Sequence, residues 1–111
     1  MENPRLIKLF EFLENNPKDS FVLYAIATEY NAKGDVENAL KFYQKTTEND
    51  PDYLGTYYHL GKLYEKLGQN ELASTTYENG ISLAIRKKDM HALSELRGAY
   101  NSLCGLDDEY D

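Results

Sequence analysis

Apolar side chains recur along this chain at intervals of three and four residues, which is the period of one face of an α-helix. Leu6, Leu9 and Leu13 show this spacing early in the chain, and Leu93 and Leu96 show it near the end. Polar residues, glycines and prolines separate the apolar stretches and mark their boundaries. The pattern predicts an all-α fold of about six helices, near residues 4–16, 19–33, 35–48, 52–67, 69–87 and 89–104.

The four central helices repeat in pairs with a period of 34 residues. When residues 17–50 are laid over residues 51–84, 7 of the 34 positions are identical. The coincident pairs are Pro17 and Pro51, Tyr24 and Tyr58, Tyr30 and Tyr64, Gly34 and Gly68, Glu37 and Glu71, Ala39 and Ala73, and Tyr43 and Tyr77. A period of this length indicates stacked supersecondary units, each unable to bury its apolar face alone.

The pattern inside each period resembles the tetratricopeptide repeat. The two copies read Leu23-x-x-Ile26-Ala27-x-x-Tyr30 with Ala39-x-x-x-Tyr43, and Tyr57-x-x-Leu60-Gly61-x-x-Tyr64 with Ala73-x-x-x-Tyr77. The resemblance covers about 68 residues. It implies a right-handed superhelical stack of antiparallel helix hairpins, an α-solenoid, with Tyr30, Tyr43, Tyr57, Tyr64 and Tyr77 in the core.

Small residues stand where the two helices of each hairpin are expected to cross. Ala27 and Gly61 lie on the first helices, and Ala39 and Ala73 lie on the second helices. Small side chains on both sides allow the helix axes to approach toward the lower end of the range of ~8–10 Å. These positions therefore support hairpins independently of the resemblance.

Local signals mark the helix ends. Gly34 and Gly68 follow the last periodic residue of the first helices, where glycine adopts a left-handed cap at little cost. Asp35 and Asn70 are expected to cap the second helices through their side chains. The run Asp50-Pro51-Asp52 combines a capping oxygen with a proline suited to a first turn, and it is expected to open the next helix.

Outside the two repeats, the chain is expected to supply capping helices. Asp89 opens the last of these, and Arg97 occupies its small-residue position, which suggests a terminal helix with a solvated outer face. The leading helix stands where the second helix of an earlier unit would lie. The expected single domain of 1–111 therefore divides into a capping helix (1–18), repeats (19–52 and 53–87), a second capping helix (88–105) and an acidic tail (106–111).

The composition of the chain limits the classes of partner that it is expected to bind. The chain has 12 basic and 19 acidic residues, a formal charge of −7, which disfavours binding to nucleic acid or to an anionic membrane surface. No apolar stretch approaches the ~18 residues that span a bilayer. The single cysteine, Cys104, cannot form an internal disulfide, and the first residues lack the features of a secretory signal. A cytoplasmic location is the default expectation.

The sequence contains few side chains that are candidates for catalysis or metal binding. His59 and His91 are not spaced as a pair of metal ligands on one helix, and Cys104 follows an apolar neighbour near the end of the last helix. No glycine-rich phosphate loop or calcium loop is present. We expect no cofactor, metal site or catalytic residue, and an enzyme would require His59, His91 and Cys104 to converge in a cleft.

The resemblance implies that the first helices line a concave surface where peptides bind. The corresponding positions here are Phe21, Tyr24, Thr28, Asn31, Gly55, Tyr58, Lys62, Glu65, His91, Ser94 and Gly98. Tyr24 and Tyr58 lie about 100° around the helix from the buried stripe. Two interpretations are open: the tyrosines anchor a ligand, as tyrosine often does at interfaces, or they pack against each other between units.

One specific use of the family does not fit. Chaperone-tail adaptors grip a carboxylate with lysine, asparagine and arginine, but the corresponding positions hold Tyr24, Thr28, His59, Asp89 and Leu93. The predicted function is therefore non-catalytic binding of a protein or peptide of unidentified sequence. The alternative is self-association, possible as a homodimer, in which another copy fills the groove or an open helical end, since two units fall short of the ~3 that a stable array needs.

Overall fold

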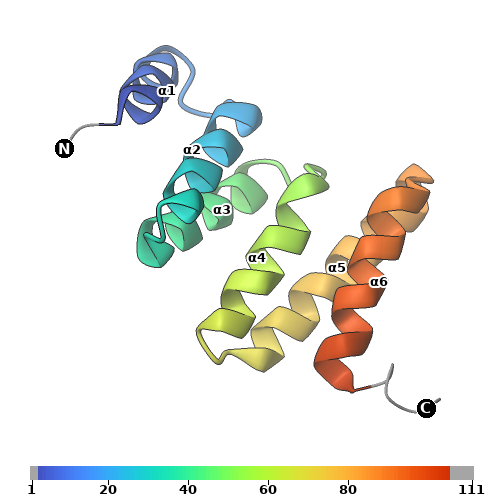
Figure 1. Cartoon of the computed structure of the whole chain (residues 1–111). Coiled ribbons are helices and arrows are strands. Elements are labelled where there is room, and N and C mark those ends of the chain that lie inside the picture. Colours follow the sequence, from blue (N-terminus) through green and yellow to red (C-terminus); the bar gives the residue numbers. More distant parts are fainter. Residues whose placement is uncertain (1–2, 106–111) are drawn as a thin grey trace. The chain divides into compact units, whose positions relative to one another are not determined.

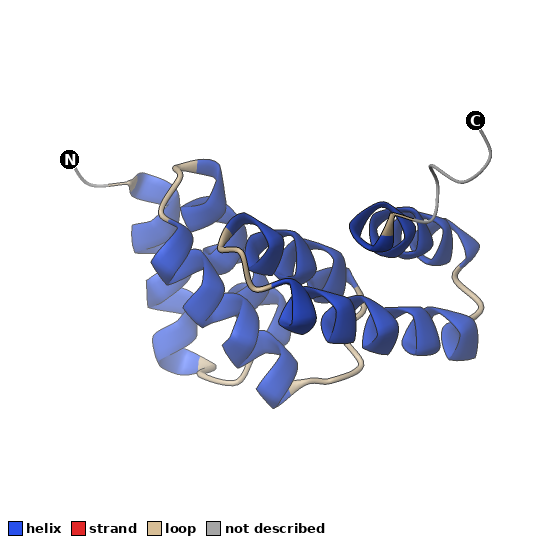
Figure 2. Cartoon of the chain, turned by 90° about the horizontal axis from the view of Figure 1, so that it is seen from below, coloured by secondary structure: helices blue, strands red, loops and turns tan. Residues whose placement is uncertain are grey.

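The computed structural model describes residues 3–105, and within that range the chain contains six α-helices and no strand (Figures 1 and 2). The helices are α1 (Pro4–Asn15), α2 (Ser20–Ala32), α3 (Val36–Asn49), α4 (Gly55–Lys66), α5 (Asn70–Lys87) and α6 (Met90–Cys104). The all-α prediction is confirmed, and the observed helix ends agree with the expected ones within about three residues. The expected acidic tail, 106–111, lies outside the described residues.

The helices fall into two compact units, of which the first contains α1, α2 and α3 within residues 3–53. Helices α2 and α3 form an antiparallel hairpin, and α1 packs on α2 (Figure 1). The fully buried residues of the hairpin include Ile26, Ala27, Ala39 and Tyr43. These are the positions at which the repeat pattern places its apolar and small residues.

The second unit contains α4, α5 and α6 within residues 54–105. Helices α4 and α5 form a second antiparallel hairpin, and α6 packs on both of them (Figure 1). A Cβ atom on Gly61 would overlap the ring of Tyr77, so the expected close approach at Gly61 is confirmed. Gly80 makes a second close approach that the repeat pattern did not indicate, since its Cβ would lie 2.8 Å from the Cβ of Tyr57.

Both expected glycine caps are confirmed. Gly34 and Gly68 adopt left-handed φ angles of 82° and 75°. The following N–H groups reach back to the helices: Asp35 N donates to Tyr30 O at 2.9 Å, and Gln69 N donates to Tyr64 O at 2.8 Å. These bonds satisfy carbonyl groups that a helix end otherwise leaves unpaired.

The residues that cap the helix N-termini agree only in part with the prediction from the sequence. Asp35 caps α3 by accepting from Asn38 N at 3.2 Å, and Asp89 caps α6 by accepting from Ala92 N at 3.0 Å. The expectation for Asn70 was wrong, because Asn70 is the first residue of α5. Gln69 stands at the cap position of α5 and makes no capping bond through its side chain.

The expectation that Asp50-Pro51-Asp52 opens a helix was also wrong, because α4 begins at Gly55 with Leu54 at its cap position. Asp50 instead ends α3, where its N–H donates to Thr46 O at 2.8 Å. One carboxylate oxygen of Asp50 accepts from Ser20 Oγ at 3.0 Å, and the other accepts from the N–H of Asp52 at 3.2 Å. The carboxylate therefore joins α2 to the end of α3 and is not free to cap α4.

The tyrosines at the repeat positions are mostly core residues. Tyr43, Tyr57, Tyr64 and Tyr77 are buried, as predicted. Tyr30 is only half-buried, in contrast to the prediction. It lies in the last turn of α2, and its ring stacks on Phe42 with centroids 5.9 Å apart.

Candidate functional site

A groove of about 390 Å³ runs between α1 and α2 in the first unit. Three of the residues that the resemblance to the tetratricopeptide repeat assigned to a binding surface line this groove. They are Phe21, Tyr24 and Thr28, which lie one helical turn apart along α2. The remaining lining residues are Arg5, Lys8, Leu9, Ala25 and Glu29. Because its lining is mostly apolar with a few charged groups at the edge, the groove has the composition of a ligand site.

Phe21 is the most unusual residue of the groove. It lies in the first turn of α2 and leaves 63% of its surface exposed to solvent. Single exposed apolar residues are common, but an exposed phenylalanine beside an apolar groove offers an aromatic contact that a partner can cover. Among the groove residues, Phe21 therefore combines an aromatic ring with a largely exposed surface.

Tyr24 is held in place by two other rings. Its ring centroid lies 5.8 Å from that of Tyr43 and 5.2 Å from that of Tyr53. Behind this cluster, the hydroxyl groups of Thr28 and Tyr43 are 3.1 Å apart and share a hydrogen bond. Burial raises the pKa of Tyr43, and the bond to Thr28 acts in the opposite direction. The ring contacts therefore fix Tyr24 as one wall of the groove.

Helix α1 supplies the other wall and the charge. The guanidinium of Arg5 lies 3.7 Å from Glu29 Oε2, and Asn3 Nδ2 donates to Glu29 Oε1 at 3.2 Å. Lys8 also lines the groove and has no ion-pair partner within residues 3–105. Sequence reasoning missed Arg5, Lys8 and Leu9 because α1 lies outside the 34-residue period, and its helical pattern alone does not indicate what it faces.

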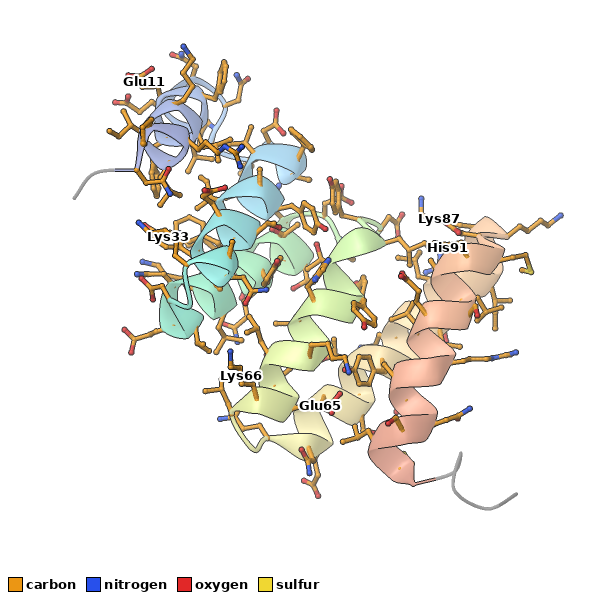
Figure 3. All side chains as sticks on the ribbon, in the orientation of Figure 1. Glu11, Lys33, Glu65, Lys66, Lys87 and His91 are labelled. Carbon is orange, nitrogen blue, oxygen red and sulfur yellow. The ribbon has the colours of Figure 1, made fainter. Side chains whose placement is uncertain are left out.

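Three further candidates, Tyr58, Lys62 and Glu65, form a line of contacts on α4. Lys62 Nζ lies 5.8 Å from the Tyr58 ring centroid and 3.9 Å from Glu65 Oε2. Glu65 in turn accepts a hydrogen bond from the Tyr77 hydroxyl of α5 (Figure 3 labels Glu65). Burial and this bond both raise the pKa of Tyr77. Glu65 is thus tied to the α4–α5 hairpin, whereas Lys62 is exposed and Tyr58 is half-buried.

The remaining residues that were predicted for a binding surface lie outside the α1–α2 groove and outside the contacts on α4. Asn31 is half-buried at the end of α2 and does not line the groove. His91 and Ser94 are exposed on α6, and His91 Nε2 lies 3.6 Å from Glu95 Oε2 (Figure 3). Gly55 and Gly98 are exposed as well, and they offer no side chain.

His59 is the one histidine in a shielded environment. Burial lowers its pKa, and the negative charge of Glu95 on α6 raises it to a smaller extent. His91 and Cys104 lie at opposite ends of α6, so about 20 Å of helix separates them. The three groups that an enzyme would require thus do not converge.

Within residues 3–105, the arrangement of side chains and helices also bears on metal binding and on membrane insertion. No cluster of three or more histidine, cysteine, aspartate or glutamate side chains is arranged to hold a metal ion within that range. None of the helices described has the length and apolar composition needed to cross a membrane.

Comparison with known proteins connects the fold to a family. The profile described as TPR repeat matches residues 27–68, and the profile described as tetratricopeptide repeat matches residues 54–84. No curated protein matches the sequence significantly.

Three solved structures illustrate the likeness. The crystal structure of a tetratricopeptide repeat domain protein from Salinibacter ruber is 43% identical, with a TM-score of 0.76 over 79% of this chain and 98% of that chain. A solution structure from the same organism, also a tetratricopeptide repeat domain protein, is 42% identical, with a TM-score of 0.75 over 86% of this chain and 94% of that one. A protein from Bordetella parapertussis, 20% identical, shares the fold with a TM-score of 0.79 over 96% of this chain and 92% of its own.

Proposed function

The chain belongs to the tetratricopeptide repeat family, and from this premise we propose that it binds a peptide segment of a partner protein in the groove between α1 and α2. Tetratricopeptide repeats are protein-interaction modules, and the family is typically non-catalytic. The half-buried Tyr58 and the exposed Lys62 on α4, with the exposed His91 and Ser94 on α6, form a further candidate surface in the second unit.

The observation that carries the proposal is the pairing of an exposed anchor with a rigid wall. Phe21 is exposed, while Tyr24 beside it is fixed by Tyr43 and Tyr53. Interface hot spots are commonly aromatic residues in such settings, because a preformed aromatic surface binds without paying for its own ordering. Arg5 and Lys8 at the edge orient a bound segment more than they hold it.

The proposed role is non-catalytic. The hydroxyl of Thr28, the one aliphatic hydroxyl among the residues that line the groove, shares a hydrogen bond with the hydroxyl of Tyr43 and not with a base. The proposed location is the cytoplasm, where the exposed thiol of Cys104 stays reduced.

Affinity capture from the native cell followed by quantitative binding tests the proposal. The captured partner should bind the Phe21→Ala variant at least about 30-fold more weakly, which corresponds to the ~2 kcal/mol of an interface hot spot. Phe12→Ala is the matched control, because Phe12 is 53% exposed on α1 and does not line the groove. Equal affinity of the two variants would place the binding site elsewhere.

A further inference from the structure

Helix α1 carries a second apolar surface that is separate from the α1–α2 groove. A shallow groove of about 610 Å³ runs along it, lined by Asn3, Leu6, Ile7, Phe10, Glu11, Leu13, Glu14 and Pro17. None of these residues lines the α1–α2 groove. Leu6 is buried and the ring of Phe10 packs on Phe42 of α3 with centroids 5.7 Å apart, so the apolar part open to solvent centres on Ile7, which is 43% exposed. Figure 3 shows Glu11 pointing away from α2. We call this surface the α1 outer face.

Helix α6 carries a matching stripe. Met90, Leu93, Arg97 and Tyr100 stand at i, i+3, i+7 and i+10, so they lie along one side of the helix. Met90 is 63% exposed, Leu93 and Tyr100 are half-buried, and Arg97 is exposed. We call these four residues the α6 stripe.

The two surfaces are complementary in charge. The α1 outer face adds the carboxylates of Glu11 and Glu14 to its apolar residues, and the α6 stripe adds the guanidinium of Arg97. None of these three charged groups has an ion-pair partner within residues 3–105. Bringing the surfaces together would cover apolar area and would pair a cation with two anions.

The order of the helices in the repeat pattern also favours a contact between α6 and α1. In the repeat pattern α1 corresponds to a second helix and α6 to a first helix, and neither has its hairpin partner among the described helices. Pairing α6 with α1 would place a first helix beside a second helix, as in α2–α3 and α4–α5. It would use a different face of α1, because the α1 positions that match Ala39 and Tyr43 in the 34-residue period are Arg5 and Leu9, which line the α1–α2 groove. The small-residue position that holds Gly61 in α4 holds Arg97 in α6, so this crossing must be wider, with the arginine reaching the carboxylates.

We propose that the α6 stripe of one copy packs on the α1 outer face of a second copy. This inference goes beyond the proposed function and does not use the α1–α2 groove. Because two different surfaces meet, the contact is heterologous, and it extends to further copies unless it closes into a ring. Two single helices bury less than the ~1,200 Å² of a standard interface, so the association is weak and depends on concentration.

A charge swap tests the proposal in the whole chain. The average mass of the wild-type chain, measured by sedimentation or light scattering, should rise with concentration. Arg97→Glu places anions on both surfaces, and the double variant Glu11→Arg/Glu14→Arg places cations on both. Each variant alone should associate on the order of tenfold more weakly, because attraction becomes repulsion. An equimolar mixture of the two should recover association, since each then meets its complement.

Controls separate this contact from folding and from peptide binding. Arg86→Glu changes an exposed arginine in the last turn of α5 and should leave association unchanged. All variants should melt within a few degrees of the wild type, because the changed side chains are exposed. Binding of the captured partner should be unaffected, so a failure here leaves the α1–α2 groove untouched. A wild-type mass independent of concentration, or a mixture that stays dissociated, overturns the proposal.

Discussion

Gly61 of α4 lies directly against the ring of Tyr77 of α5, with no room for a Cβ atom between them. A Cβ on Gly61 would lie 2.7 Å from both Cδ1 and Cζ of Tyr77, well inside van der Waals contact. Tyr77 is fully buried, and its hydroxyl donates to Glu65, so the ring is held from both ends. The α4–α5 hairpin therefore requires glycine at this crossing.

Substituting this glycine should destabilise the protein. Gly61→Ala forces the Tyr77 ring or the helix axes to move, and overpacking of this kind costs about 1–3 kcal/mol of the free energy of unfolding. Gly98→Ala is the control, because a Cβ there meets nothing within 4 Å in the middle of α6. Alanine at an open helical site should stabilise by about 0.5–1 kcal/mol. Denaturant unfolding measures both, and shifts of the same sign would contradict the close crossing.

The hydrogen bond from Tyr77 to Glu65 should contribute measurably to stability. Tyr77→Phe removes the hydroxyl and keeps the ring, so the loss should be about 1 kcal/mol, as for a typical hydrogen bond, since Glu65 stays partly solvated. Tyr100→Phe is the matched control, because its hydroxyl donates to Glu78 at 3.1 Å in an exposed setting. It should change the midpoint of thermal unfolding much less. Similar losses for both variants would mean that the Glu65 bond is not special.

The sequence predicted what depends on local rules and on the period. Gly34 and Gly68 cap their helices as expected, because a left-handed residue after a helix is a local requirement. Asp50 was misassigned because its carboxylate is engaged by Ser20, which is 30 residues away. A long-range contact of this kind leaves no mark on the neighbouring sequence.

The candidate site also contains one part that the sequence predicted and one part that depends on tertiary packing. The resemblance to the repeat family implied that Phe21, Tyr24 and Thr28 share one face, and in the structure these three residues line one groove. The opposite wall, with Lys8 among its residues, belongs to a helix that has no counterpart in the repeats. Its role comes from tertiary packing, which periodicity does not encode.

Stability should respond to pH through His59. Burial holds the pKa of folded His59 below its ordinary value of about 6.5, so the unfolded chain binds the proton more tightly. The contribution of His59 to stability is therefore complete above pH ~7 and is lost as the pH falls through 6.5 toward the folded pKa.

Unfolding titrations of two variants isolate this effect. His59→Gln should flatten the stability curve between about pH 7 and pH 5, because the titrating group is gone. Glu95→Gln, which removes the negative charge that raises the pKa of His59, should steepen that slope. A wild-type slope that persists in His59→Gln would assign the pH dependence to other groups.

Tyr58 and Tyr64 should separate binding from folding on a single helix. Tyr58 is half-buried on α4, and its ring contacts Lys62 and His59, whereas Tyr64 is buried in the core. If Tyr58 anchors a ligand, Tyr58→Ala should weaken partner binding by about 2 kcal/mol with little change in the midpoint of thermal unfolding. Tyr64→Ala should instead destabilise the fold by about 3–5 kcal/mol, as large core truncations do. The loss of stability in Tyr24→Ala should lie between the losses in Tyr58→Ala and Tyr64→Ala, because Tyr43 and Tyr53 pack on the ring of Tyr24. A Tyr58→Ala variant that melts as early as Tyr64→Ala would favour packing between the repeats over ligand binding.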